Sequence, residues 1–271
     1  MKKILLVLLT SSTLALSACS HKEKSNTVSV GTIAGPETKL MSVAKKVASK
    51  EFGLHVKIVE FTDYTMPNQA LEDGQIDANA FQHYPFLLSQ IKAHGYSFAA
   101  VGDTFLYPMG LYSTGVKKLS ELSPGDKIAI PNDPSNEARA LLLLQKAGLI
   151  TLKPHVTIDA TTQDIASNPK DFKIITLDAA QTPRALPDVA LVAINTNYAT
   201  PAGLSPSKDA LFEEGTDSPY MNLIVARAAD RNEKKIKELV EAYQSEPVLL
   251  EAKKLFGDAA VAGFTVKQAS Q

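Results

Sequence analysis

The sequence predicts an α/β protein of two lobes, each a mixed sheet flanked by helices, joined by two hinge strands. Short runs rich in β-branched residues alternate with helical patterns along the chain, which is typical of α/β units. Two extended segments, near residues 105–112 and 218–226, interrupt this alternation, and the pattern begins afresh after the first. Two crossing segments between two α/β blocks favour a body that opens and closes around a cleft. We therefore place lobe 1 at residues 28–106 and 222–264, and lobe 2 at residues 107–221.

The first block begins with a strand at residues 28–33, which leads into a helix through Gly35 and Pro36. Proline is favoured in the first helical turn, and Gly53 marks the end of the helix. The apolar residues between them recur at the i, i+3, i+4, i+7 spacing of one helix face, at Leu40, Val43, Ala44 and Val47. The other elements expected in this block are a strand at 54–61, a helix near 67–73, a strand at 76–80, a helix at 84–93 and an extended segment at 98–101.

The second block opens with a strand at residues 127–130 and a helix at 135–147 that Gly148 ends. The stretch 141–144 is apolar on all sides, so this helix is expected to be buried on more than one side. The elements expected next are a strand at 155–158, a helix near 163, a strand at 173–177, a helix near 183 and a strand at 189–194. After the second crossing segment we expect a helix with Ile236, Leu239, Val240 and Tyr243 on one face, and a last helix near 248–256.

The N-terminus has the form of an export signal. Lys2 and Lys3 precede an apolar run at 4–16, which has the length of a signal-peptide core and is too short to span a bilayer. The run ends in Leu-Ser-Ala-Cys, which looks like a bacterial lipobox with Cys19 as the lipidated residue. Cys19 is the only cysteine of the chain, so it cannot form an internal disulfide. We therefore predict a signal peptide at residues 1–18.

The residues after the signal peptide predict where the protein is held. Residues 19–27 are polar and charged, and we interpret them as a flexible tether between the lipid and the folded body. Ser20 stands where an Asp would retain a lipoprotein in the inner membrane of a Gram-negative bacterium. We expect a periplasmic protein, anchored to the cell membrane or the outer membrane by lipid on Cys19. Residues 265–271 are expected to form a tail.

Composition and motifs argue against several classes of function. The chain carries 28 Lys and Arg against 29 Asp and Glu, with no basic stripe, so we expect no nucleic-acid partner. The sequence contains neither a Gly-x-Ser-x-Gly elbow nor a phosphate-binding Gly-x-x-x-x-Gly-Lys loop. Its five histidines are scattered, which gives little support to a metal site. We expect a binding protein and not an enzyme, without a cofactor or metal, and we interpret Glu213-Glu214 as solvated surface.

Two segments carry polar and aromatic residues where a ligand could be bound. Phe81, His83 and Tyr84 surround a strand-to-helix junction, where core packing and ligand contact are equally favoured. The segment 131–139 enters the Leu-rich helix with residues suited to capping, and Arg139 follows within the first turns. A cation there is unfavourable to the helix dipole unless it meets an anion. Arg139 is either an exposed helix arginine or the group that grips a ligand carboxylate.

Three asparagines complete the candidate site. Asn195 and Asn197 follow an apolar strand, and Asn222 lies within another. A buried asparagine is costly unless its amide is hydrogen-bonded, and a ligand could supply that partner. A turn cap is the simpler interpretation for Asn197, less so for Asn222.

Together these segments resemble the methionine-binding lipoproteins of the methionine ABC importer, the NlpA-type lipoproteins. The resemblance covers the chain from the lipobox to about Phe264. The motifs that carry it are Asp63-Tyr64 with Pro67-Asn68, Asp77-Ala-Asn-Ala-Phe-Gln-His83, Pro131-Asn-Asp-Pro with Asn136 and Arg139, Ala193-Ile-Asn195, and Ser218-Pro-Tyr-Met-Asn222-Leu-Ile-Val.

The resemblance implies a two-lobed periplasmic-binding-protein fold that captures methionine, in the L or the D form, in the cleft between the lobes. It also implies delivery to the permease and ATPase subunits of an ABC importer. It assigns Arg139 to the methionine carboxylate, and Asn195 and Asn222 to the polar groups of the ligand. It places three residues around the ligand side chain and the closing cleft: Tyr64, Phe81 and His83.

Other functions stay open at this point. The nearest alternative is a binding lipoprotein for another amino acid or a small peptide. A metal-binding lipoprotein, a hydrolase and an adhesin-like surface module are further alternatives, and the scattered histidines disfavour the first of these three.

Overall fold

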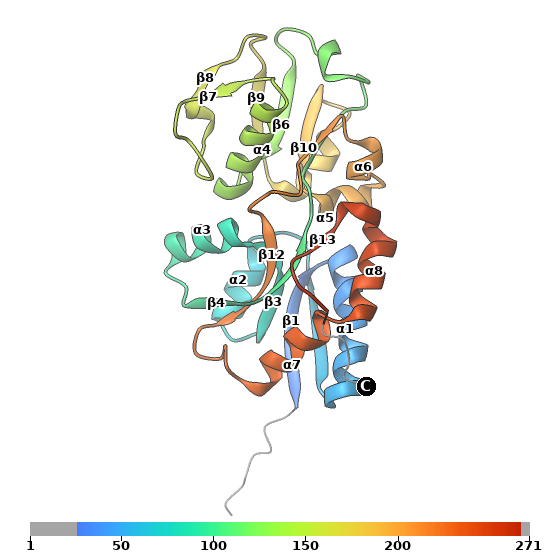
Figure 1. Cartoon of the computed structure of the whole chain (residues 1–271). Helices are drawn as coiled ribbons and strands as arrows, with labels where there is room; N and C mark the ends of the chain where they lie inside the picture. The colour runs from blue at the N-terminus through green and yellow to red at the C-terminus, as the bar shows by residue number, and fades with distance from the viewer. Residues whose placement is uncertain (1–25, 267–271) are drawn as a thin grey trace, which may run out of the picture.

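The computed structural model describes residues 26–266 and shows two α/β lobes, one above the other (Figure 1). The predicted signal peptide, Cys19 and nearly all of the predicted tether lie outside the described residues. The last predicted tether residue, Thr27, is the first residue of a strand. In the part of the chain that is described, no helix is long and apolar enough to cross a membrane.

The first lobe is built on a mixed sheet of six strands, of which two are contributed by the C-terminal part of the chain. These strands are β1 Thr27–Ile33, β2 His55–Phe61, β3 Ala78–His83, β4 Phe98–Leu106, β12 Met221–Arg227 and β13 Val261–Ala262. They lie in the order β13-β4-β12-β3-β1-β2. β1 is parallel to β2 and β3, whereas β12 is antiparallel to β3 and β4.

Within the described part of the chain, five α-helices cover the two faces of this sheet. They are α1 Pro36–Phe52, α2 Met66–Glu72, α3 Tyr84–His94, α7 Lys234–Tyr243 and α8 Glu246–Phe256. α1, α7 and α8 share one apolar core with the sheet, and α2 and α3 pack on a second. Gly53 ends α1 in the left-handed conformation, with φ of 61°, which glycine adopts without steric penalty. The elements predicted for α1 and β2 are therefore found where the sequence places them.

The second lobe is built on a five-stranded sheet, and the longest helix of this lobe is buried against it. Its strands are β5 Gly110–Tyr112, β6 Lys127–Pro131, β9 Lys173–Leu177, β10 Leu191–Ile194 and β11 Phe212–Glu213, in the order β11-β5-β10-β6-β9. β7 Thr151–Leu152 and β8 Ile165–Ser167 form a separate ladder. Its α-helices are α4 Pro134–Lys146, α5 Thr196–Ala199 and α6 Pro206–Asp209. Short 3₁₀ segments lie at Leu119–Glu121, Thr162–Asp164, Ala179–Ala185 and Thr200–Ala202.

The chain crosses between the two sheets twice. It runs from β4 to β5 through residues 107–109, and from β11 to β12 through residues 214–220. Met221 of β12 pairs with Leu106 of β4, so both crossings meet the first lobe at the same place. A pair of adjacent crossings is the arrangement that a hinge between lobes requires. We propose that the lobe boundaries fall at these crossings.

The prediction of a strand at residues 155–158 is wrong. His155 has φ of 68°, a left-handed conformation that does not continue a strand. The chain turns there, and β7 and β8 supply the short ladder of this region instead. The helices expected near residues 163 and 183 are 3₁₀ segments.

The strand expected at residues 76–80 is displaced toward the C-terminus. It begins at Ala78 and extends to His83, because the N–H groups of Gln75 and Ile76 bond back to a carbonyl of α2. The motif Phe-Gln-His therefore forms the end of a buried strand and not a loop.

We expect Leu141→Ala to lower the free energy of unfolding by about 2–5 kcal/mol, the usual cost of a leucine-sized cavity. Leu141 is fully buried in α4, whereas the next residue, Leu142, is only partly buried. Leu142→Ala is therefore the matched control and should cost clearly less. Urea unfolding of the two variants makes the comparison, and equal losses would contradict the packing described for α4.

Candidate ligand-binding site

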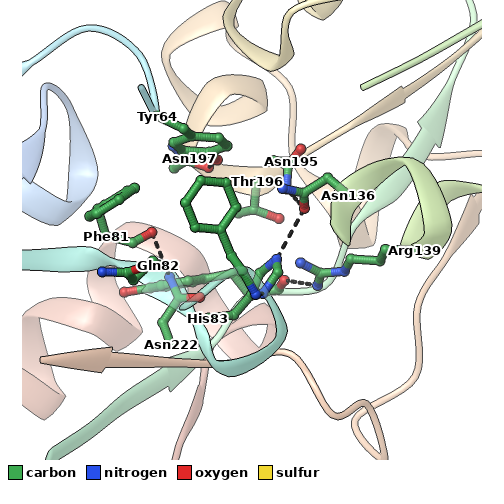
Figure 2. Close-up of a pocket in the computed structure, with 12 residues that line it drawn as sticks. Tyr64, Phe81, Gln82, His83, Asn136, Arg139, Asn195, Thr196, Asn197 and Asn222 are labelled. Atoms are coloured by element: carbon green, nitrogen blue, oxygen red, sulfur yellow. Dashed lines mark hydrogen bonds between the residues drawn. The ribbon is translucent and has the colours of Figure 1, made fainter. Parts of the chain in front are cut away.

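A narrow cavity lies between the two lobes, and Figure 2 shows the side chains that surround it. The first lobe and the crossing contribute Tyr64, Phe81, Gln82, His83, Phe86, Tyr107 and Asn222. The second lobe contributes Asn136, Arg139, Asn195, Thr196 and Asn197. The structure thus brings all six predicted ligand-binding residues to one cavity, while Tyr84 is about half exposed outside it, at 49%. The crevice at the ends of strands is where α/β folds usually bind ligands.

The cavity is nearly filled by the side chains of the protein. Its volume is about 20 Å³, which is room for on the order of one water molecule. An amino acid is several times larger, so a ligand of that size requires the lobes or the lining side chains to move apart.

His83 is held as a neutral ring that joins the two lobes. Its Nδ1 accepts the backbone N–H of Phe86, 3.1 Å away, and thereby caps α3. Its Nε2 therefore carries the proton and donates to Oδ1 of Asn136, 3.1 Å away in the other lobe. Burial, and secondarily the positive charge of Arg139, lower the pKa of His83 to about 3.

Asn136 is the hydrogen-bonding centre of the second lobe. Its Nδ2 donates to the carboxylate of Asp133, at 2.9 and 3.0 Å. This contact fixes the amide, so that Oδ1 accepts from both His83 and Asn195, the latter at 2.8 Å. From the sequence alone Asn136 belongs to a helix-capping segment, and no local signal distinguishes it as the link between the lobes.

Arg139 is buried, with 4% of its surface exposed, and it is paired with an acid of the protein itself. Its Nε donates to Glu214 at 3.1–3.2 Å, and its Nη2 donates to the same carboxylate and, at 2.8 Å, to the Tyr107 carbonyl. The ring of Tyr220 lies 4.4 Å from the guanidinium carbon. Nη1 has no hydrogen-bond partner among residues 26–266, so one edge of the guanidinium is left for a ligand.

The interpretation of Glu213-Glu214 as solvated surface is wrong for the second residue. Glu214 is 12% exposed and forms the ion pair with Arg139, whereas Glu213 is exposed. The anion that a cation in α4 needs is thus supplied from a segment 75 residues away in sequence. A pairing of that separation has no signal in local sequence pattern.

Aromatic rings form the wall of the cavity in the first lobe. The ring centroids of Tyr64, Phe81 and Phe86 lie 5.8 Å apart in each pair, a favourable distance for tilted or edge-to-face packing. The Tyr64 hydroxyl donates to Oδ1 of Asn197 across the cleft at 2.6 Å. Asn197, for which a turn cap was the simpler interpretation, therefore takes part in closing the two lobes.

A buried amide cluster lies beside this wall, on α2 and β3. Asn68, Asn79 and Gln82 are at most 2% exposed, and their amides bond to one another at 2.7–3.0 Å. Because each amide has its partner, this polar cluster rigidifies the end of β3. Gln82 also lines the cavity.

Asn222 presents its amide oxygen to the cavity. Its Nδ2 lies 3.5 Å from the Phe81 carbonyl and 3.3 Å from Oε1 of Glu37. A carbonyl only accepts hydrogen bonds, so the amide nitrogen must face these groups and the oxygen must face away from them. An acceptor is therefore available to a cationic or N–H group of a ligand.

Two α/β lobes that close on a shared polar cavity define the class of two-lobed periplasmic binding proteins. The chain belongs to the NlpA lipoprotein family, whose model matches residues 28–264. The predicted fold class and the family resemblance are thereby confirmed.

Three similar proteins illustrate this relationship. The "D-methionine-binding lipoprotein MetQ" of Salmonella typhi is 50% identical, over 93% of this chain and 94% of that protein. A solved ABC transporter periplasmic substrate-binding protein from Coxiella burnetii is 60% identical, with a TM-score of 0.85 over 87% of this chain and 100% of the other. A nutrient binding protein from Burkholderia cenocepacia, solved bound to methionine, is 51% identical, with a TM-score of 0.86 over 88% of this chain and 100% of the other.

We expect the neutral state of His83 to make the folded protein less stable in acid. Because the pKa of His83 falls from 6.5 to about 3 on folding, the unfolded chain binds more protons between those values. The free energy of unfolding therefore falls as the pH falls through that window. His83→Gln should remove up to about 1.4 kcal/mol of this loss per pH unit.

Urea unfolding between about pH 7 and 5 measures the difference between the variant and the unmodified protein. The exposed His94 offers the control His94→Gln, which should retain the original dependence. A His83→Gln variant with that same dependence would contradict the assignment.

Proposed function

We propose that this chain captures methionine in the cleft between its lobes and delivers it to the permease of an ABC importer. The observation that carries the proposal is the meeting of Arg139 from one lobe and Asn222 from the other at one cavity walled by aromatic rings. The methionine-bound Burkholderia relative supports the choice of ligand. Binding without chemical change is the usual role of ABC-transporter substrate-binding proteins such as the Coxiella relative.

The chemistry of the cavity suits an amino acid with a thioether side chain. Nη1 of Arg139 would receive the carboxylate, and Oδ1 of Asn222 the ammonium group. Two more buried atoms of the lining, Oδ1 of Asn195 and Nδ2 of Asn197, have no partner among the described residues. An unpaired buried group costs about 1–3 kcal/mol, which a polar ligand would relieve. Sulfur packs well against aromatic rings, here those of Tyr64 and its neighbours.

We expect Arg139→Ala and Asn222→Ala each to weaken methionine binding by about 2–5 kcal/mol, because a buried charged or polar contact is lost. Isothermal titration calorimetry measures the loss directly. Arg184 and Asn232 are exposed, so Arg184→Ala and Asn232→Ala are matched controls that should bind normally. Unchanged affinity in both cavity variants would falsify the site assignment.

A wider hollow beside the cavity favours one alternative ligand class. It has a volume of about 370 Å³, and it shares Tyr64 and Phe86 with the cavity. These rings form the partition between the two spaces. A small peptide, or another amino acid with a longer side chain, could extend into the hollow if the rings turned aside.

Thermal denaturation with a panel of amino acids and dipeptides discriminates between these ligands. A ligand at a thousand times its dissociation constant adds about 4 kcal/mol to the free energy of unfolding. We expect the largest shift with L- or D-methionine. A larger shift with a methionine-containing dipeptide would instead assign the hollow to the binding site.

Anchoring at the membrane is the second part of the proposal. Cys19 follows a signal-peptide core, and the chain belongs to a lipoprotein family. Several acyl chains hold a protein stably at a bilayer, whereas a single chain is marginal. We propose a periplasmic protein held by lipid on Cys19, close to the permease and ATPase that it supplies.

We expect Cys19→Ala to move the protein from the membrane fraction to the soluble fraction of the cell, since no thiol is left for the lipid. Fractionation followed by mass spectrometry of the mature N-terminus measures this change. Ser25→Ala, in the same tether, is the control and should remain membrane-bound. A Cys19→Ala protein that stays in the membrane fraction would rule out this anchor.

A further inference from the structure

A buried carboxyl group lies behind Asn222, outside the residues predicted for the site. Glu37 belongs to the first turn of α1 and is 4% exposed. Its Oε1 lies 3.3 Å from Nδ2 of Asn222, and its Oε2 is buried without a hydrogen-bond partner among residues 26–266. Half of this carboxyl group is therefore unsatisfied.

The first turn of α1 favours an acid through the helix dipole, and the backbone at Ile33 and the amide of Asn222 favour the charged form of Glu37, but no counter-charge meets it in the described structure. It takes part in no ion pair there, unlike Glu214, which is paired with Arg139. The N-cap of α1 is Gly35, and no side chain caps that helix. An isolated buried acid destabilises a protein unless a charge or a set of hydrogen bonds compensates it. Such a group at the edge of a cavity is therefore a candidate for function.

We propose that Glu37 is the counter-charge for the ligand's α-ammonium group and acts on it through Asn222. The inference rests on the proposed function, because it requires an amino acid in the cavity. Asn222 donates its amide N–H to Glu37, which turns the amide oxygen toward the ammonium group. Glu37 is thus a positioning residue, and its negative charge strengthens the chain of hydrogen bonds from ammonium to amide to carboxylate.

This arrangement divides the two charges of an amino acid between the lobes. Arg139 on α4 meets the carboxylate from the second lobe, while Glu37 on α1 and Asn222 on β12 meet the ammonium group from the first. Only a ligand that carries both charges at this spacing satisfies both lobes. The site therefore selects the zwitterionic α-amino acid over the corresponding amine or acid.

Proton release accompanies binding in this scheme. Burial raises the pKa of Glu37 well above its ordinary value, which favours the protonated carboxyl group in the empty protein. The arriving ammonium group favours the carboxylate, and the proton passes to the buffer. Methionine affinity should therefore rise with pH until Glu37 is already ionised in the empty protein.

The other titratable groups near the cavity do not account for this release of a proton on binding. Tyr64, Tyr107, Tyr198 and Tyr243 have raised pKa values and stay neutral. The pKa of His83 is about 3, so its ring stays neutral too. Arg139 is paired with Glu214. Burial also raises the pKa of Asp133, whose carboxylate bonds to Asn136 in the second lobe, and a Glu37 variant leaves that group unchanged.

The test is a thermodynamic cycle with two ligands and two proteins. Calorimetry would compare methionine with its deaminated analogue, 4-(methylthio)butanoate, on the unmodified protein and on Glu37→Gln. We expect the substitution to weaken methionine binding by about tenfold or more, since a charge-assisted contact becomes a neutral one. Binding of the deaminated analogue should be unchanged. Equal losses for the two ligands would show a merely structural role and overturn the proposal.

Glu238→Gln is the matched control. Glu238 is a second buried glutamate of the first lobe, also with an unpartnered Oε2 among the described residues, and it lies on α7 and not at the cavity. This variant should bind both ligands like the unmodified protein.

Proton release gives a second readout that needs no variant. Titrations of the unmodified protein in phosphate and in Tris, which differ in ionisation enthalpy, count the protons released. We expect release with methionine and none with the deaminated analogue. No release with either ligand at any pH from about 5 to 8 would overturn the proposal even if Glu37→Gln fails to fold. Absence of any methionine binding to the unmodified protein would instead refute the proposed function.

Discussion

The ion pair of Arg139 with Glu214 is the contact on which the binding site depends. A guanidinium stays charged even in a protein interior, so Arg139, which is 4% exposed, needs a partner, and removal of one member of a buried pair typically costs about 3–5 kcal/mol. Glu214, the Tyr107 carbonyl and the Tyr220 ring hold three sides of the group. Its orientation is therefore set before any ligand arrives, and the ligand meets one prepared edge.

The same pair determines the net charge of the cavity. The charges of Arg139 and Glu214 cancel, and the other titratable groups of the lining are neutral tyrosines and a neutral His83. A ligand with a net charge would bring an uncompensated charge into a region shielded from water. A zwitterion brings two charges that sum to zero, and each can lie near a group of the opposite sign, Arg139 for the carboxylate and Glu37, through Asn222, for the ammonium group. The ion pair of Arg139 on α4 thus bears on the kind of ligand that the cleft accepts.

The parts of this structure that sequence predicts are those encoded locally. The spacing of Leu40 and Ala44, with Gly53 after them, defines α1 without reference to the rest of the chain. The same reasoning fails at His155, because its left-handed backbone breaks a run of strand-forming residues. Polar and aromatic residues at strand ends, Arg139 in the first turns of α4 and, for Tyr64, the family resemblance predicted six members of the site, whereas the roles of Asn136, Glu214 and Glu37 depend on partners distant in sequence. The roles of these three residues can be recognised only in the folded chain.

In this closed form the cavity is too small for an amino acid, yet the contacts that close it help to select the ligand. Among residues 26–266, three hydrogen bonds join the lobes there: His83 to Asn136, Tyr64 to Asn197, and the Tyr198 hydroxyl to the Thr62 carbonyl at 3.4 Å. All three are neutral contacts, each worth about 0.5–1.5 kcal/mol net, whereas contacts to charged groups contribute about 1.5–3 kcal/mol. A ligand that enters the cleft must replace some of these neutral contacts with contacts to charged groups. An apolar molecule cannot form contacts to charged groups. The neutral contacts that hold the lobes closed therefore compete with binding, and only a molecule with charged ends displaces them.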